Sequence, residues 1–208
     1  MLKVNTTLQS INLAGNDIVF RGDMAGVKAL CAMLKVNTTL QSINLENTAL
    51  NSEAAKHISQ GLKENNTLTS LNLADNRICA LKVNKTLTSI NLNNNALCGL
   101  YSEYSDGSGR LLGTYNAEGI TAVTEMLQVN STLTSISLAE NAICYRGEMA
   151  GLNALCEMLK VNMTLQSINL SNNSIGIKTE NNRVVDAPTA LAEALKVNNT
   201  LTSIKCAA

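Results

Sequence analysis

The segment LQSINLAGNDI, residues 8–18, determines the architecture because variants of it return six more times along the chain. Within each copy apolar residues alternate with small polar ones, which is typical of a short strand with one buried face. A phrase that recurs this often indicates an array of structural repeats. The other copies begin at Leu40, Leu68, Leu87, Leu133, Leu165 and, in shortened form, Leu201.

Several segments between these copies have the spacing of an amphipathic helix. Residues 24–36 place Val27, Leu30 and Leu34 on one face, and residues 149–161 repeat the same pattern. A strand followed by a helix and then by another strand predicts one parallel sheet with the helices outside it.

A longer duplication lies over the short one. Residues 8–47 and 133–172 match at about 28 of 40 positions, with an offset of 125 residues. A segment of 40 residues near the start of the sequence therefore has a close copy in the second half.

Composition argues against several classes of function. Lys+Arg and Asp+Glu both count 16, so the chain lacks the basic surplus of a nucleic-acid-binding domain. No apolar run approaches the ~18 residues of a membrane helix, and we predict no membrane partner. The six cysteines form no CxxC motif and His57 is the only histidine. We therefore predict no catalytic residues, no metal site and no cofactor.

The repeated phrase, L-x-x-I/L-x-L-x-x-N-x-I/L, resembles the signature of leucine-rich repeats, and the resemblance covers essentially the whole chain. Spacings of 28–32 residues with helical second halves resemble the ribonuclease-inhibitor-like subclass. The resemblance implies an α/β solenoid shaped as a horseshoe, with parallel strands on the concave face and helices on the convex face. We expect about seven repeats, one of which lacks its helix.

One column of asparagines follows the strands. In the family this side chain bonds the backbone where the chain leaves the strand, so we predict a structural ladder. Thr48 departs from the column, which predicts a weaker ladder in the second repeat. The ladder consists of Asn16, Asn76, Asn95, Asn141 and Asn173.

A second column of asparagines closes the helices, and we predict that these residues adopt the left-handed conformation common at helix ends. Each also begins an N-x-T sequon, so the alternative is a glycosylated, secreted protein. We favour unmodified sequons, reduced thiols and a cytoplasmic location. The column consists of Asn5, Asn37, Asn65, Asn84, Asn130, Asn162 and Asn198.

Two surfaces are candidates for binding a partner. Aromatic and arginine side chains gather in the segments that leave the strands, and the register places them on one rim of the horseshoe. Their structural alternative is to cover the core where these loops leave the sheet. The rim set comprises Phe20, Arg21, Tyr101, Tyr104, Arg110, Tyr115, Tyr145 and Arg146. The alternative surface is the concave face, represented by Asn12, Asn44, Asn72, Asn91 and Asn169.

The middle of the chain is irregular. The repeat from Leu68 spans only 19 residues and leaves no room for a helix after Ile78. The next repeat carries an inserted loop, residues 98–116, which we predict folds back over the helix-poor gap. We interpret residues 1–208 as a single leucine-rich-repeat domain and as a fragment of a longer array.

The favoured function is a non-catalytic protein–protein interaction scaffold, whose partner is another protein that the sequence does not name. One alternative is a GTPase-activating protein of the Ran GTPase-activator type, although that family member has more repeats and an acidic tail. Another is the ligand-sensing segment of a larger immune-type receptor. The oligomeric state is left open by the sequence.

Overall fold

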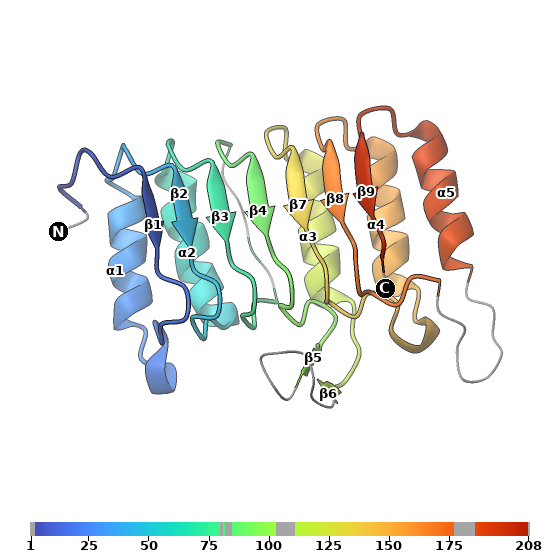
Figure 1. Cartoon of the computed structure of the whole chain (residues 1–208), viewed down its shortest axis with the longest axis horizontal. Helices are drawn as coiled ribbons and strands as arrows, with labels where there is room; N and C mark the ends of the chain where they lie inside the picture. The colour runs from blue at the N-terminus through green and yellow to red at the C-terminus, as the bar shows by residue number, and fades with distance from the viewer. Residues whose placement is uncertain (1–2, 80, 82–84, 103–110, 177–185, 208) are drawn as a thin grey trace.

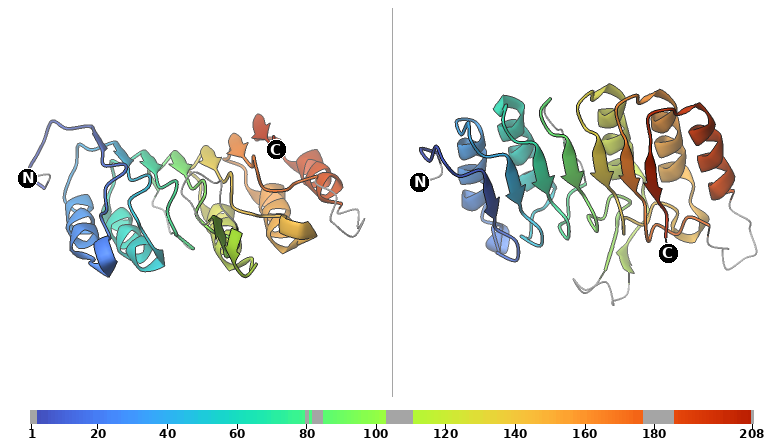
Figure 2. Two further views of the ribbon diagram at one scale, coloured as in Figure 1. Left: turned by 60° about the horizontal axis from the view of Figure 1, so that its bottom comes forward. Right: turned by 45° about the horizontal axis from the view of Figure 1, so that its top comes forward.

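The computed structural model describes residues 3–79, 81, 85–102, 111–176 and 186–207. Seven strands form one parallel sheet in the order β1-β2-β3-β4-β7-β8-β9, and the helices lie on one side of it (Figures 1 and 2). The predicted α/β repeat architecture is thereby confirmed. The strands are β1 (Ser10–Asn12), β2 (Ser42–Asn44), β3 (Ser70–Asn72), β4 (Ser89–Asn91), β7 (Ser135–Ser137), β8 (Ser167–Asn169) and β9 (Ser203–Lys205).

The strands stack in strict register, so that each repeated position forms a column. In β1 and β2, Ser10 pairs with Ser42 and Ile11 pairs with Ile43. The equivalent residues pair in every other neighbouring pair of strands in the sheet. The isoleucines and leucines point toward the helices and build an aliphatic core, in which Ile43, Leu71 and similar residues are buried. The helices are α1 (Ala25–Leu34), α2 (Ser52–Glu64), α3 (Glu118–Val129), α4 (Ala150–Val161) and α5 (Ala187–Val197).

Between β3 and β4 the described residues contain no helix, as predicted from the short repeat. In the described part of this repeat, Ile78 and Leu81 are both buried. Helix α3 approaches its backbone closely at Gly119, where an added Cβ would lie 2.5 Å from the Cys79 carbonyl oxygen. The glycine therefore lets α3 pack directly against the backbone of the short repeat, on the side where a helix is missing.

The described part of the insert forms a two-stranded hairpin, β5 (Leu100–Ser102) and β6 (Leu111–Gly113). The hairpin lies at the lower edge of the molecule (Figure 1), where its Tyr101 ring centroid is 4.6 Å from the guanidinium of Arg77 in the helix-less repeat. Residues 103–110 of the insert lie outside the described residues, so its folding over the gap stays a prediction.

The prediction of left-handed helix ends was wrong. Asn65 has φ −82° and ψ 134°, an extended conformation, and Asn162 is similar. Their side chains explain the column instead. The Asn65 Oδ1 accepts hydrogen bonds from the backbone N–H groups of Thr67 and Leu68, two and three residues further along the chain. The Asn65 Nδ2 donates to the Leu34 carbonyl at 2.8 Å. The column is therefore a second ladder that joins neighbouring repeats.

No described helix is long and apolar enough to span a bilayer.

Candidate interaction surfaces

The asparagine ladder fixes where each loop leaves the sheet. The Asn141 Nδ2 donates to the Leu92 carbonyl of the preceding repeat at 2.9 Å and to the Leu138 carbonyl of its own repeat at 3.0 Å. Its Oδ1 accepts from the backbone N–H groups of Asn95 and Leu97. Each loop is thus held in a fixed position relative to its neighbour.

The ladder has the same pattern in its interior and loosens at the first repeats. Asn76, Asn95 and Asn173 are buried and donate to carbonyls of the preceding repeat, whereas Asn16 is exposed. Thr48 is buried too, and its hydroxyl donates to the Leu45 carbonyl of its own repeat at 2.6 Å. The side chain of threonine is shorter than that of asparagine, which explains why the Thr48 hydroxyl donates to a carbonyl of its own repeat.

Two of the loops end in nearly identical turns, η1 (Phe20–Gly22) and η2 (Tyr145–Gly147). In both, the arginine has a positive φ, 48° for Arg21 and 51° for Arg146, and a glycine follows it. The turn brings each arginine over the preceding ring, at 5.1 Å from the Phe20 centroid and 5.3 Å from the Tyr145 centroid. Both arginines remain exposed, so each turn presents a cation on an aromatic base.

Tyr115 lies inside the rim. Its hydroxyl donates to the Ile143 carbonyl at 3.0 Å and accepts from the Gly151 N–H at 3.3 Å. Burial raises the pKa of this hydroxyl to about 12. Tyr115 therefore covers the core between two repeats, which is the structural alternative stated for the rim aromatics.

An open groove of about 530 Å³ lies between the hairpin and η2. Leu111 is 40% exposed and Leu100 is buried, so the hairpin provides an apolar wall. The opposite side carries an aromatic ring, a cation and an anion. The lining residues are Leu100, Leu111, Gly113, Thr114, Tyr115, Tyr145, Arg146 and Glu148.

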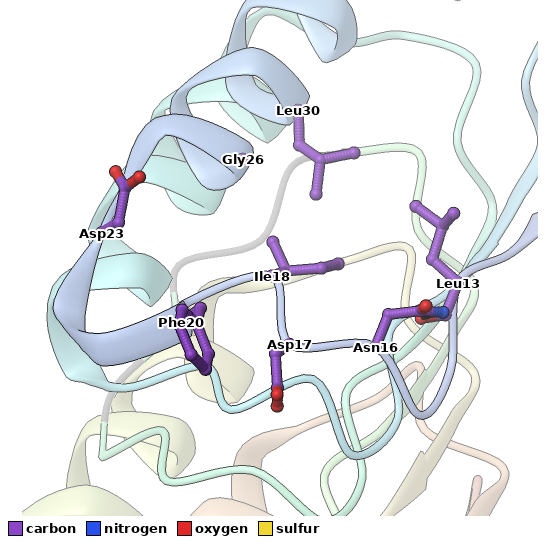
Figure 3. A pocket seen from close by; sticks show the side chains of 8 residues that line it. All are labelled: Leu13, Asn16, Asp17, Ile18, Phe20, Asp23, Gly26 and Leu30. Atoms are coloured by element: carbon purple, nitrogen blue, oxygen red, sulfur yellow. Dashed lines mark hydrogen bonds between the residues drawn. The ribbon is translucent and has the colours of Figure 1, made fainter.

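A pocket of about 400 Å³ lies beside η1, at the free end of the sheet. Figure 3 shows Leu13, Ile18 and Leu30 converging on it from the strand, the loop and α1. Two carboxylates, Asp17 and Asp23, lie at its border. The remaining lining residues are Asn16, Phe20 and Gly26.

The rest of the predicted rim set is divided. Tyr101 is half-buried, and the Arg77 guanidinium lies 4.6 Å from its ring centroid. Arg77 is not among the rim residues predicted from the sequence, and its only signal there is its place directly after the ladder residue Asn76. Tyr104 and Arg110 lie outside the described residues.

The asparagines of the concave face largely satisfy their own backbone. The Asn44 Oδ1 accepts from the Glu46 N–H, and Asn12 and Asn91 make the equivalent bond two residues on. Asn72 and Asn169 do the same, and in addition their amides donate to Glu46 and Ser137. These side chains end each strand with an Asx turn, which leaves a polar and nearly flat face.

The six cysteines are free thiols. Burial raises the pKa values of Cys98 and Cys144 to about 12, so neither thiol ionises near neutral pH. Within the described ranges, no three residues among His, Cys, Asp and Glu are placed to hold a metal ion.

Comparison with known proteins agrees with this architecture. Residues 4–18, 64–78 and 161–176 match the family model of the leucine-rich repeat. No curated protein sequence matches the chain. The repeated phrase, the parallel sheet and these matches together support leucine-rich repeats along the chain. The ribonuclease-inhibitor-like subclass stays a prediction.

Two solved structures are similar to the chain. One is described as leiomodin-1 actin-binding site 2, at 20% identity and a TM-score of 0.45, covering 94% of this chain and 86% of that one. The other is the tropomodulin C-terminal domain of Caenorhabditis elegans, at 13% identity and a TM-score of 0.43, covering 95% of this chain and 88% of that one.

Proposed function

We propose that this chain is a non-catalytic protein-interaction scaffold and that the groove between the hairpin and η2 is its binding site. The observation that carries the proposal is the lining of this groove: an exposed leucine, Leu111, an aromatic ring, Tyr145, and a cation, Arg146, all line it. Aromatic and arginine side chains beside an apolar depression are the residues that dominate protein interfaces. The concave face, in contrast, offers small polar groups that already bond their own backbone.

The groove suits one kind of ligand. An apolar side chain of the partner fits between Leu111 and Tyr145, and an acidic side chain next to it reaches Arg146. Glu148 lies at the same groove and disfavours a second acidic group there. We therefore propose a protein segment in which an apolar anchor adjoins a single acidic residue.

Quantitative affinity capture tests this function. The immobilised full chain is incubated with lysate of the source cell, and bound proteins are measured for the wild type and for Tyr145→Ala/Arg146→Gln. The matched control is Phe20→Ala/Arg21→Gln, because it changes the duplicate turn and leaves the groove intact. We expect the groove variant to lose at least about tenfold of the captured partner, the cost of one hot spot of about 1.4 kcal/mol or more.

The captured amounts are compared only for variants that keep the melting temperature of the wild type, so that a loss of capture is not a loss of fold. Equal capture by the wild type and the groove variant overturns the proposed site. If substitution of the concave residue Asn91 abolishes capture instead, the concave face is the binding surface.

We also propose a cytoplasmic location with unmodified sequons. The Asn162 Nδ2, the atom that would carry a glycan, is buried and donates to the Leu127 carbonyl at 2.6 Å. A glycan on this atom would remove a bond between repeats. The intact mass of protein isolated from its source should equal the mass of the unmodified chain, and a mass increased by several glycans would contradict this location.

A further inference from the structure

Exposed apolar side chains gather on the rim opposite the groove. On this rim the helices end and the strands begin, at the top of Figure 1, whereas the hairpin lies at the bottom. Among the described residues, the large apolar side chains with high exposure lie here, apart from Phe20 and Leu111 of the lower rim. They are Val4, Val36, Val129, Val161, Met163 and Val197.

Three of these valines occupy one position of the repeat. Val129 is the last residue of α3, Val161 of α4 and Val197 of α5. Residues two apart on a helix face different directions, so the turn that buries Leu159 in the core leaves Val161 outside. Val161 is 55% exposed although α4 packs against α3 on one side and α5 on the other. Its exposure therefore follows from its position within the repeat.

The three valines form a continuous surface. Packed helices lie about 8–10 Å apart, so the valines that end α3, α4 and α5 follow one another at about that interval. Met163, which is 56% exposed, adds a larger apolar side chain beside Val161. We call Val129, Val161, Met163 and Val197 the valine ridge. Contiguous exposed apolar surface marks an interaction site, whereas single exposed apolar side chains are ordinary.

The first helices provide an internal comparison. Val36 follows α1 and is 55% exposed, the same fraction as Val161. The equivalent residue after α2 is Glu64, whose carboxylate lies 2.8 Å from the Lys35 ammonium in an ion pair. Val36 is thus a single valine beside charged groups, while Val161 lies between two further valines.

Carboxylates border the valine ridge on the outer face of the helices. Each lies four residues before a valine, which places it one turn away on the same side of the helix. Lysines pair with the carboxylates of α4 and α5, but Gln128 takes the lysine position in α3. The border thus carries one more negative than positive side chain, and the three helix ends add partial negative charge. The carboxylates are Glu125, Glu157 and Glu193, and the lysines are Lys160 and Lys196.

We propose that the valine ridge binds an amphipathic α-helix of a partner protein, with apolar residues at heptad spacing and basic residues beside them. An α-helix rises 1.5 Å per residue, so residues seven apart on one face are separated by about 10 Å, the interval of the ridge valines. The acidic border attracts lysine and arginine, and it disfavours an anionic membrane surface. This surface lies on the rim opposite the groove, so it is a second binding surface beyond the proposed function.

Fluorescence anisotropy with a defined probe tests this proposal. The probe is a labelled peptide of three heptads, with leucine at the a and d positions and lysine and alanine elsewhere. Val129→Ser/Val161→Ser should weaken its binding to the full chain at least about tenfold. The matched control Val36→Ser removes an equally exposed single valine and should bind as the wild type does. All three side chains are exposed, so each variant should keep the melting temperature of the wild type.

Two further variants test the charge and the place of binding. Glu125→Gln removes a border carboxylate and should weaken binding about threefold at low salt. The groove variant Tyr145→Ala/Arg146→Gln should bind the peptide as tightly as the wild type, which separates this surface from the proposed partner site.

Several results would overturn the proposal. They are a wild type that does not bind the peptide saturably, a ridge variant that binds as Val36→Ser does, and a loss of binding in the groove variant. Co-sedimentation with vesicles of phosphatidylcholine and phosphatidylserine tests the membrane as occupant. Binding of the wild type to these vesicles that is lost in Val129→Ser/Val161→Ser would identify a membrane surface and contradict a helical partner.

Discussion

The two copies at residues 8–47 and 133–172 share about 28 of 40 positions and occupy different environments. The second copy lies inside the array, where the hairpin and Tyr115 close over it and Asn141 is 0% exposed. The first copy lies at the edge, where Asn16 is exposed and a pocket opens beside η1. The comparison teaches that a repeat's sequence determines its own shape, while its neighbour determines whether that shape is core or binding surface.

The turns η1 and η2 show the same contrast at the rim. Each places an arginine over a ring with almost the same backbone angles. The groove beside η2 is bordered by the hairpin, whose Leu111 adds an apolar wall, whereas the pocket beside η1 is bordered by residues of the first repeat and α1. The hairpin of the insert therefore makes η2, and not η1, part of the proposed partner site.

The ladder asparagines should show the largest difference between the copies. Asn141→Ala leaves the Leu92 and Leu138 carbonyls and two backbone N–H groups without partners in the core, which costs about 2–4 kcal/mol of unfolding free energy. Asn16→Ala at the exposed equivalent should cost about 0.5 kcal/mol. Urea unfolding of both variants measures these values, and equal losses would contradict a role for the neighbouring repeat.

Tyr115 should account for a smaller part of the contrast. Tyr115→Phe keeps the ring but leaves the Ile143 carbonyl and the Gly151 N–H without their partner, for an expected loss of about 1–2 kcal/mol. The control Tyr145→Phe removes a hydroxyl from the rim and should change stability by about 0.5 kcal/mol or less. Thermal unfolding followed by circular dichroism separates the two. A Tyr115→Phe variant as stable as the control would mean that the hydroxyl does not hold the repeats together.

Much of this could be predicted from the sequence, because the columns repeat seven times and each repetition tests the same assignment. The strands, the missing helix after Ile78 and the positions of the asparagine column followed from the repeat spacing, and the resemblance to leucine-rich repeats implied the ladder. The sequence failed where a side chain serves another repeat. Asn65 was interpreted as a left-handed cap, although its amide reaches across to Leu34. Spacing along one chain carries no information on such contacts between neighbouring repeats.

The insert illustrates the same limit. Its apolar residues predicted burial, and Leu100 is buried, but the spacing did not predict that the described part of the insert forms a hairpin at the lower edge of the molecule (Figure 1). Arg77 was overlooked because its partner, Tyr101, belongs to a different repeat.

The buried thiol of Cys144, which the first copy lacks, should distinguish the two copies at alkaline pH. Burial raises the pKa values of Cys98 and Cys144 from 9.0 to about 12 in the folded chain. The folded state therefore holds protons that the unfolded state has released, and the free energy of unfolding should fall as pH rises from about 9 to 12, with no effect below 9.

The first copy provides the variant for this test, because Val19 occupies the position of Cys144. Cys144→Val should weaken the alkaline loss of stability without lowering stability at about pH 8. Denaturant unfolding at several pH values between about 8 and 11 measures the slope. An unchanged slope in Cys144→Val would show that this thiol does not contribute.

Hydrogen–deuterium exchange of the two copies in one sample compares their environments directly. At low protein concentration, amides around β1 and η1, including Ser10, should exchange faster than those around β7 and η2. Equal exchange in both copies would contradict this account.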